Sequence, residues 1–228
     1  MNYLNENINL GGCLEYKGNK YDVDIEKDNF NSIAYAFDNS NEIELTQALE
    51  KGVLKIIEQL NNDILKIHII DFDVTRKFRN LNQLKHIENL INYVDASNIK
   101  QTLNEIEKTV IDYNNNYLTD SISNICEYNK QNNDFPLNYN IVIINFNYLD
   151  ISNEHYISLD KLLKHGRNAG VLFFFLFNSS TFATEIVESR NKNNFNNKQK
   201  IEFLELILSK SITIYKTKDR YLTEVSHL

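Results

Sequence analysis

Apolar residues recur along this chain in two patterns, one typical of helices and one typical of buried strands. Residues 43–60 carry apolar side chains at spacings of three and four, which predicts an amphipathic helix. A second stripe with this spacing runs through residues 99–117 and predicts a long helix. Short segments rich in apolar residues predict strands at 32–37, 65–72, 141–146 and 171–177. A helix at 201–208 and a closing strand at 211–215 complete the pattern.

This order of elements predicts an α/β fold with a mostly parallel β-sheet flanked by helices. The strands at 141–146 and 171–177 are apolar on consecutive positions, as expected of strands buried on both faces. No composition break divides the chain, so we expect a single domain over residues 1–228. Residues 1–28 form its N-terminal strand and hairpin extension, in which the sequence KGNK predicts the hairpin turn. Ligands of such sheets lie beyond the carboxyl ends of the strands.

Polar segments carry three further expectations. Asn41 precedes the first long helix, and Glu44 follows three residues later, which predicts a capping box. A polar loop containing Arg76, Lys77 and Arg79 follows the strand at 65–72. Residues 190–200 are rich in asparagine and lysine, and we expect a mobile surface loop there.

Charge and composition narrow the function classes. The 228 residues include 31 acidic and 24 basic side chains, which gives a formal net charge of −7. No basic run with interleaved aromatics is present, so we expect no nucleic-acid partner. No apolar run approaches the roughly 20 residues that cross a bilayer, so we expect no direct membrane insertion. Cys13 and Cys126 are far apart and indicate neither a disulfide framework nor a metal site.

The sequence HGRNAG before the apolar run VLFFFLF carries a family resemblance. Gly166, Arg167, Ala169 and Gly170 are similar to the GRAAGIH-type segment of the FtsK/SpoIIIE family of P-loop motors. The order of strands and helices also resembles that family over most of the chain. The resemblance implies a P-loop NTPase fold of the RecA-like type. In motor assemblies an arginine such as Arg167 contacts a neighbouring module, although an ordinary salt bridge explains it equally well.

The turn after the first buried strand departs from the family. A working phosphate-binding loop reads G-x-x-x-x-G-K-[ST], because glycine amides surround the phosphates, lysine neutralises them and the hydroxyl binds magnesium. The matching positions are Asp38, Asn39, Ser40, Asn41, Glu42, Ile43, Glu44 and Leu45. They include no glycine and no lysine. Glu42 and Glu44 place carboxylates at the helix start, where they suit the helix dipole and repel a nucleotide.

The strand at 141–146 departs from the family as well. The acidic pair that would hold magnesium and activate water falls on Asn145 and Phe146. We therefore expect no catalytic residue, no metal and no cofactor, with ATP binding absent or weak. The residues from Asp38 to Glu44, together with Asn145 and Phe146, are interpreted as a vestigial nucleotide site.

Within the family, the chain is most similar to the C-terminal ATPase-like domain of type VII secretion coupling proteins. That resemblance implies a non-catalytic or very weakly active ATPase-like domain that recognises or regulates secreted WXG-type helical proteins. Its other partners would be neighbouring ATPase modules of the same coupling protein. We expect a cytoplasmic location, as part of a membrane-anchored protein.

Two alternatives stay open at this point. The chain is a DNA-translocating motor domain or a fragment of one, or it is a Rossmann-like enzyme that uses Asp71 and Asp73. Without a partner base or a phosphate loop, strand-end capping explains the two aspartates better than catalysis does. His68 lies within a predicted strand and is interpreted as a core residue, and the other histidines lack metal-ligand spacing.

Overall fold

The computed structural model describes most of the chain. The described residues are 7–9, 14–16, 19–21, 24–26, 32–60, 62–73, 75, 77–149, 151–191, 198–217 and 220–225. Cys13, Gly18, Arg76 and His227 lie outside these residues, and so do the expectations placed on them.

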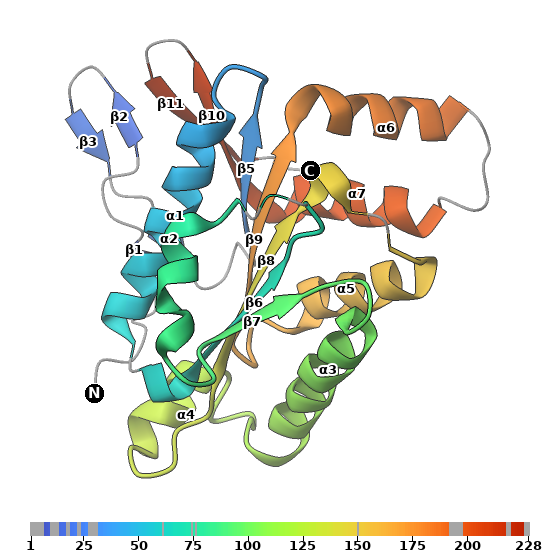
Figure 1. Cartoon of the computed structure of the whole chain (residues 1–228). Coiled ribbons are helices and arrows are strands. Elements are labelled where there is room, and N and C mark those ends of the chain that lie inside the picture. The colour runs from blue at the N-terminus through green and yellow to red at the C-terminus, as the bar shows by residue number, and fades with distance from the viewer. Residues whose placement is uncertain are drawn as a thin grey trace.

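A seven-stranded sheet forms the centre of the molecule (Figure 1). Its strands are β5 (Ser32–Phe37), β6 (Leu65–Ile70), β7 (Ile91–Val94), β8 (Tyr139–Asn145), β9 (Val171–Asn178), β10 (Ser211–Thr217) and β11 (Arg220–Val225). The strand order is β11-β10-β5-β9-β8-β6-β7. All neighbours from β10 to β7 pair in parallel, and only β11 pairs antiparallel with β10. The predicted α/β fold with a mostly parallel sheet is confirmed.

Helices cover both faces of this sheet (Figure 1). They are α1 (Glu42–Gln59), α2 (Arg79–Asn82), α3 (Ile99–Asn116), α4 (Ile125–Gln131), α5 (Asn153–His165), α6 (Ser179–Asn191) and α7 (Lys198–Lys210). Short 3₁₀ turns occur at Asn62–Ile64, Gln83–His86 and Phe146–Tyr148. Helices α1 and α2 lie on one face, and α3, α5, α6 and α7 lie on the other.

The core lies between the sheet and these helices. Every residue of β8 is buried, and so is β9 up to Phe177, as the consecutive apolar runs predict. Helix α1 contributes its apolar stripe to one side of the core, with Leu45, Leu49 and Val53 each 0% exposed. Burial of such stripes, rather than helix propensity alone, stabilises helices of this length.

Two small antiparallel sheets belong to the N-terminal extension. Strand β2 (Leu14–Tyr16) pairs antiparallel with β3 (Asn19–Tyr21), as the predicted hairpin requires, while residues 17 and 18 of its turn lie outside the described residues. Strand β1 (Asn7–Asn9) pairs antiparallel with β4 (Asp24–Glu26), and these two strands precede and follow β2 and β3 in the sequence.

Two of the sequence expectations are wrong in part. The segment after β6 is not only a polar loop, because it contains α2, a 3₁₀ turn and the edge strand β7. The expected surface loop at residues 190–200 overlaps two helices, since α6 extends to Asn191 and α7 begins at Lys198, and its residues 192–197 lie outside the described part of the chain. Both segments lack a clear apolar period in the sequence, which is why their regular structure escapes pattern analysis.

Candidate functional site

The candidate site lies at the carboxyl edge of the sheet, between β5 and β9. These strands are neighbours, but the chain leaves β5 toward α1 on one face and leaves β9 toward α6 and α7 on the other (Figure 1). Such a change of direction creates the crevice in which parallel α/β sheets bind ligands. The predicted vestigial positions after β5 and at the end of β8 all lie at this edge.

The turn after β5 is closed by hydrogen bonds to its own side chains. The Ser40 amide donates to Asp38 Oδ1 over 2.7 Å, and the Ser40 hydroxyl donates to the same oxygen over 2.6 Å. These hydrogen bonds hold the pKa of Asp38 below its usual value. The carboxylate of Asp38 therefore already accepts the hydrogen bond that the Ser40 amide could offer to a bound anion.

Asn41 stands at the start of α1 but does not cap it as predicted. Its Oδ1 accepts the Asp38 amide over 2.9 Å, and its side chain makes no capping bond to the helix. The capping-box expectation for Asn41 is therefore wrong, because the tight turn competes for the same oxygen. The first turn of α1 carries Glu42 and Glu44, as the sequence indicates.

Two asparagines link the carboxyl ends of β5 and β9. The side-chain amide of Asn178, the last residue of β9, donates to Asn39 Oδ1 over 3.0 Å. The hydroxyl of Ser179 donates to the Phe37 carbonyl over 3.2 Å. The carboxyl ends of β5 and β9 are thus linked by two hydrogen bonds.

The end of β8 continues this network toward β6. Asn145 is 0% exposed, and its side-chain amide donates to Asp71 Oδ1 over 2.9 Å. Its Oδ1 accepts the amide of Asn147 over 3.2 Å, and Asn147 Oδ1 in turn accepts the amide of Asn178 over 3.0 Å. A continuous series of amide contacts therefore runs from Asp71 to Asn39 across four strand ends.

Phe146, the other predicted vestigial position beside Asn145, has an aromatic ring that packs against the core. Its ring lies 5.8 Å from that of Phe175, 6.2 Å from Phe182 and 6.1 Å from Phe203, measured between centroids. Aromatic clusters of this kind stabilise a fold by burial and edge-to-face contact. Phe146 has no group that accepts or donates a proton, so this position carries no acid–base chemistry.

Asp71 and Asp73 have different environments. Burial raises the pKa of Asp71, although hydrogen bonds from Asn145 and from the amides of Asp73 and Lys77 oppose the shift. Burial alone would also raise the pKa of Asp73, but hydrogen bonds from Thr75 and Lys77 outweigh it and lower that pKa. Asp71 thus serves the strand-end network, and Asp73 belongs to an ion pair.

Lys77, from the segment after β6, places a positive charge at the start of α1. Lys77 Nζ donates to Glu42 Oε1 and lies 3.3 Å from Asp73 Oδ2. Burial would lower the pKa of Lys77, but Glu42 and Asp73 outweigh it and raise that pKa. The turn has no lysine of its own, and Lys77 comes to it from the segment after β6. Lys77 is already neutralised by two carboxylates.

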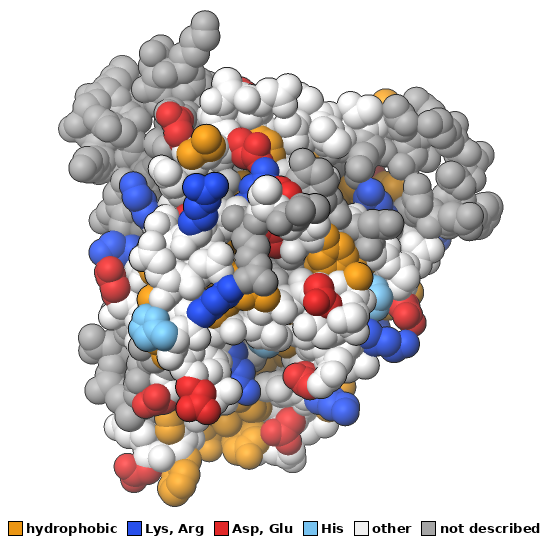
Figure 2. All heavy atoms as spheres, in the orientation of Figure 1, with side chains coloured by type: hydrophobic (Ala, Val, Ile, Leu, Met, Phe, Trp, Pro, Cys, Tyr) orange, Lys and Arg blue, Asp and Glu red, His pale blue; other side chains and the backbone are white. Residues whose placement is uncertain are grey.

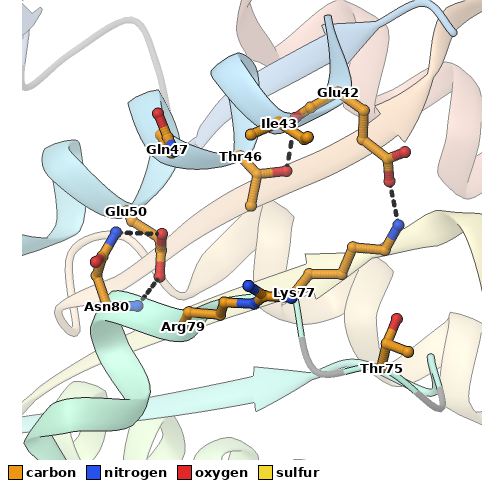
Figure 3. A pocket seen from close by; sticks show the side chains of 9 residues that line it. All are labelled: Glu42, Ile43, Thr46, Gln47, Glu50, Thr75, Lys77, Arg79 and Asn80. Atoms are coloured by element: carbon orange, nitrogen blue, oxygen red, sulfur yellow. Dashed lines mark hydrogen bonds and ion pairs between the residues drawn. The ribbon is translucent and has the colours of Figure 1, made fainter.

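A pocket of about 360 Å³ opens between α1 and the segment after β6 (Figure 3). It is lined by Glu42, Ile43, Thr46, Gln47, Glu50, Thr75, Lys77, Arg79 and Asn80. The face of the molecule drawn in Figure 2 shows acidic and basic side chains interspersed among its coloured residues. Sequence patterns do not reveal this pocket, because its two walls are separated along the chain and meet only in the fold.

The other residues singled out in the sequence lie elsewhere. Arg167 lies in the turn before β9, at the amino edge of the sheet and so at the opposite end from the strand-end network. His68 is buried in β6 and contacts Asn140 and Asn92. Tyr113 and Tyr117 stack edge-to-face with centroids 5.9 Å apart, as helix packing predicts. Among the described residues, no cluster of His, Cys, Asp or Glu is arranged to hold a metal ion.

Solved structures of secretion ATPases share this architecture. ATPases 2 and 3 of EccC from Thermomonospora curvata, in complex with a signal sequence peptide, match with a TM-score of 0.62 and 12% sequence identity. ATPases 2 and 3 of EssC from Geobacillus thermodenitrificans match with a TM-score of 0.61 and 13% identity. The chain has the fold of an FtsK/SpoIIIE-type ATPase domain. At this identity the likeness shows the fold, and activity has to be argued from the site.

The FtsK/SpoIIIE-type fold covers almost all of this chain but only part of those proteins. The match spans 93% of this chain and 34% of the EccC structure, and 94% of this chain and 37% of the EssC structure. The pCW3 conjugation coupling protein TcpA matches at a TM-score of 0.50 and 12% identity, over 99% of this chain and 65% of that one. No family model and no curated protein matches the sequence. No helix among the described residues has the length and apolar character that crossing a membrane requires.

Proposed function

We propose that this chain is a non-catalytic docking domain of a type VII secretion coupling protein. In this role it recognises secreted WXG-type proteins and works beside ATPase modules of the same coupling protein. It is a cytoplasmic part of a membrane-anchored assembly. The secretion ATPases that share its fold support the setting, and the chemistry of the strand ends supports the loss of catalysis.

One observation carries the non-catalytic part of the proposal. The polar groups at the strand ends are hydrogen-bonded to one another, from Asp71 through Asn145 and Asn147 to Asn178 and Asn39. A nucleotide would have to break these contacts, and the loop offers no lysine of its own in return. These hydrogen bonds therefore disfavour the binding of a triphosphate independently of its charge.

The charge of the site acts in the same direction. Asp38 already places a carboxylate on the Ser40 amide, and Glu42 and Glu44 occupy the first turn of α1. A helix N-terminus attracts anions, but carboxylates at the same end satisfy its dipole and repel phosphate groups. Lys77 does not reverse this balance, because Glu42 and Asp73 neutralise it.

A rigid domain without chemistry suits a docking role. The parallel sheet is buried on both faces and holds the surrounding helices in fixed positions, which presents a preformed surface to a partner. The EccC structure that shares this fold contains a signal sequence peptide. By analogy, the partner proposed for this chain is the tail of a small helical secreted protein.

Two titrations of the purified chain test the proposal. Isothermal calorimetry with ATP and magnesium should give no saturable heat, and ATP should not raise the melting temperature. Peptides made from the C-terminal tails of WXG-type proteins of the same genome should bind and raise it, because a ligand stabilises the folded state that it binds. Micromolar ATP binding with turnover would refute the non-catalytic role. Failure of every tail to bind would refute the docking role.

A further inference from the structure

The pocket between α1 and the segment after β6 has the size and rigidity of a binding site. Its volume of about 360 Å³ falls at the lower end of the range for ligand pockets. Glu50, which is 2% exposed, accepts the amides of Asn80 and Leu81 over 2.7 and 3.2 Å and the side-chain amide of Asn80 over 2.7 Å. These three bonds fix the start of α2 against the third turn of α1. The two walls of the pocket are therefore held at a fixed distance.

The two cations that line the pocket are in different states. Lys77 is committed to Glu42 and Asp73. Arg79 is exposed, and its guanidinium has no hydrogen bond or ion pair within the part of the chain that the structure describes. Figure 3 shows its side chain extending from the start of α2 alongside Lys77. A guanidinium presents a planar pair of donors that matches a carboxylate.

The opposite wall contributes an apolar contact. Ile43 is 73% exposed on the first turn of α1 and lines the same pocket. A single exposed isoleucine is ordinary on a protein surface. Here it lines the same preformed pocket as the Arg79 guanidinium, so a ligand that packs an aliphatic group on Ile43 would also bring a carboxylate within reach of Arg79.

The charges in and around the pocket limit what it accepts. Among the described residues that line or adjoin the pocket, Lys77 and Arg79 are basic and Glu42, Glu50 and Asp73 are acidic. A ligand with one carboxylate gains the contact with Arg79, whereas a polyphosphate also brings several negative charges close to Glu42 and Glu50. These charges therefore favour a ligand with a single carboxylate over a nucleotide.

We infer that this pocket binds a peptide segment that presents one carboxylate to Arg79 and a neighbouring aliphatic side chain to Ile43. The inference rests on the proposed docking function for the source of the peptide, the tail of a secreted protein. It adds the place of binding and the side chains that the tail must carry.

Matched variants of the full chain test this site with fluorescent tail peptides. Arg79→Ala and Ile43→Ser should each weaken binding by about tenfold or more, the loss typical of a central interface contact. Lys108→Ala and Ile111→Ser are the matched controls, since both residues are exposed on α3, on the other face of the sheet. The controls should bind like the parent chain, and all four variants should keep its melting temperature.

A peptide in which the carboxylate is replaced by its amide completes the test. It should bind the parent chain as weakly as the original peptide binds the Arg79→Ala variant, with no further loss when both changes are combined. Full-strength binding of tails to both pocket variants would overturn this site and leave the docking function standing. If no tail binds the parent chain, both proposals are overturned.

Discussion

The carboxylate of Asp71 accepts a hydrogen bond of 2.9 Å from the side-chain amide of Asn145, and this contact joins the ends of β6 and β8. The two residues are 74 positions apart in the chain. In an active domain of this fold, the family resemblance places an acidic residue at the position of Asn145. A carboxylate there would face Asp71 directly, so the asparagine and the aspartate form a complementary pair.

Restoring the acidic residue should therefore damage the fold rather than repair the site. Asn145→Asp removes the amide donor and sets two carboxylates together in a largely buried place, which should lower the free energy of unfolding by about 1–3 kcal/mol. The exchanged pair, Asp71→Asn with Asn145→Asp, keeps one amide and one carboxylate and should recover most of the loss. Urea unfolding at neutral pH measures all three proteins. Unchanged stability of the single variant would show that the pair has no structural role.

Restoring the magnesium-binding hydroxyl in the first loop should also be costly. The matching position, Leu45, is 0% exposed in the core. Leu45→Thr loses the burial of a leucine side chain and buries a hydroxyl, so we expect a loss of about 1.5–3 kcal/mol or more. Gln47→Thr, at an exposed position of the same helix, controls for the lower helix propensity of threonine. Equal effects of the two changes in urea unfolding would contradict a core role for Leu45.

Glu50 should be worth more to the fold than an exposed glutamate of the same helix. Glu50→Ala leaves the amides of Asn80 and Leu81 without their acceptor, and we expect a loss of about 1–3 kcal/mol. Glu58→Ala removes only an exposed pair with Lys55 and should change stability by about 0.5 kcal/mol or less. Hydrogen exchange of the Asn80 and Leu81 amides should become faster in the Glu50 variant alone. Slow exchange there would show that other groups hold α2.

The sequence predicts those strands and helices whose apolar residues follow a regular pattern. The stripe on α1 and the consecutive apolar residues of β8 and β9 identify the core elements, because burial on a helix face or on both sheet faces leaves a direct mark in the sequence. The edge strand β7 leaves no such mark. Its first three residues are only partly buried or exposed, and pairing with β6 forms it.

The candidate site is predicted only in part, for a different reason. The missing glycines, lysine and acidic pair are local facts of the sequence. The contacts that replace them join residues from different strand ends, such as Asn39 with Asn178 and Lys77 with Glu42, and no spacing rule connects such distant positions. The pocket at Arg79 belongs to the same class, since the fold alone brings α1 and α2 together.

His68 should make the fold sensitive to mild acid. Its ring donates from Nε2 to Asn140 Oδ1 over 3.1 Å and accepts at Nδ1 from the Asn92 amide over 3.4 Å, which fits the neutral form. Burial lowers the pKa of His68, with a smaller contribution of the same sign from Lys66, while Asn140 and Glu105 oppose the shift. The unfolded chain therefore binds a proton at a pH where the folded chain does not. Stability should fall as the pH drops below about 6.5, the ordinary histidine value.

A comparison of variants isolates this contribution. His68→Gln removes the titrating ring, so its free energy of unfolding should fall less than that of the parent chain between about pH 7.5 and pH 5.5. His86→Gln, at an exposed position, should keep the parent's pH dependence. Asp71 has the opposite effect on the free energy of unfolding. Because its pKa is raised, the folded chain binds a proton more tightly than the unfolded chain does as the pH approaches the ordinary carboxyl range. Identical pH profiles for the parent and His68→Gln would show that burial of the ring does not set the acid response.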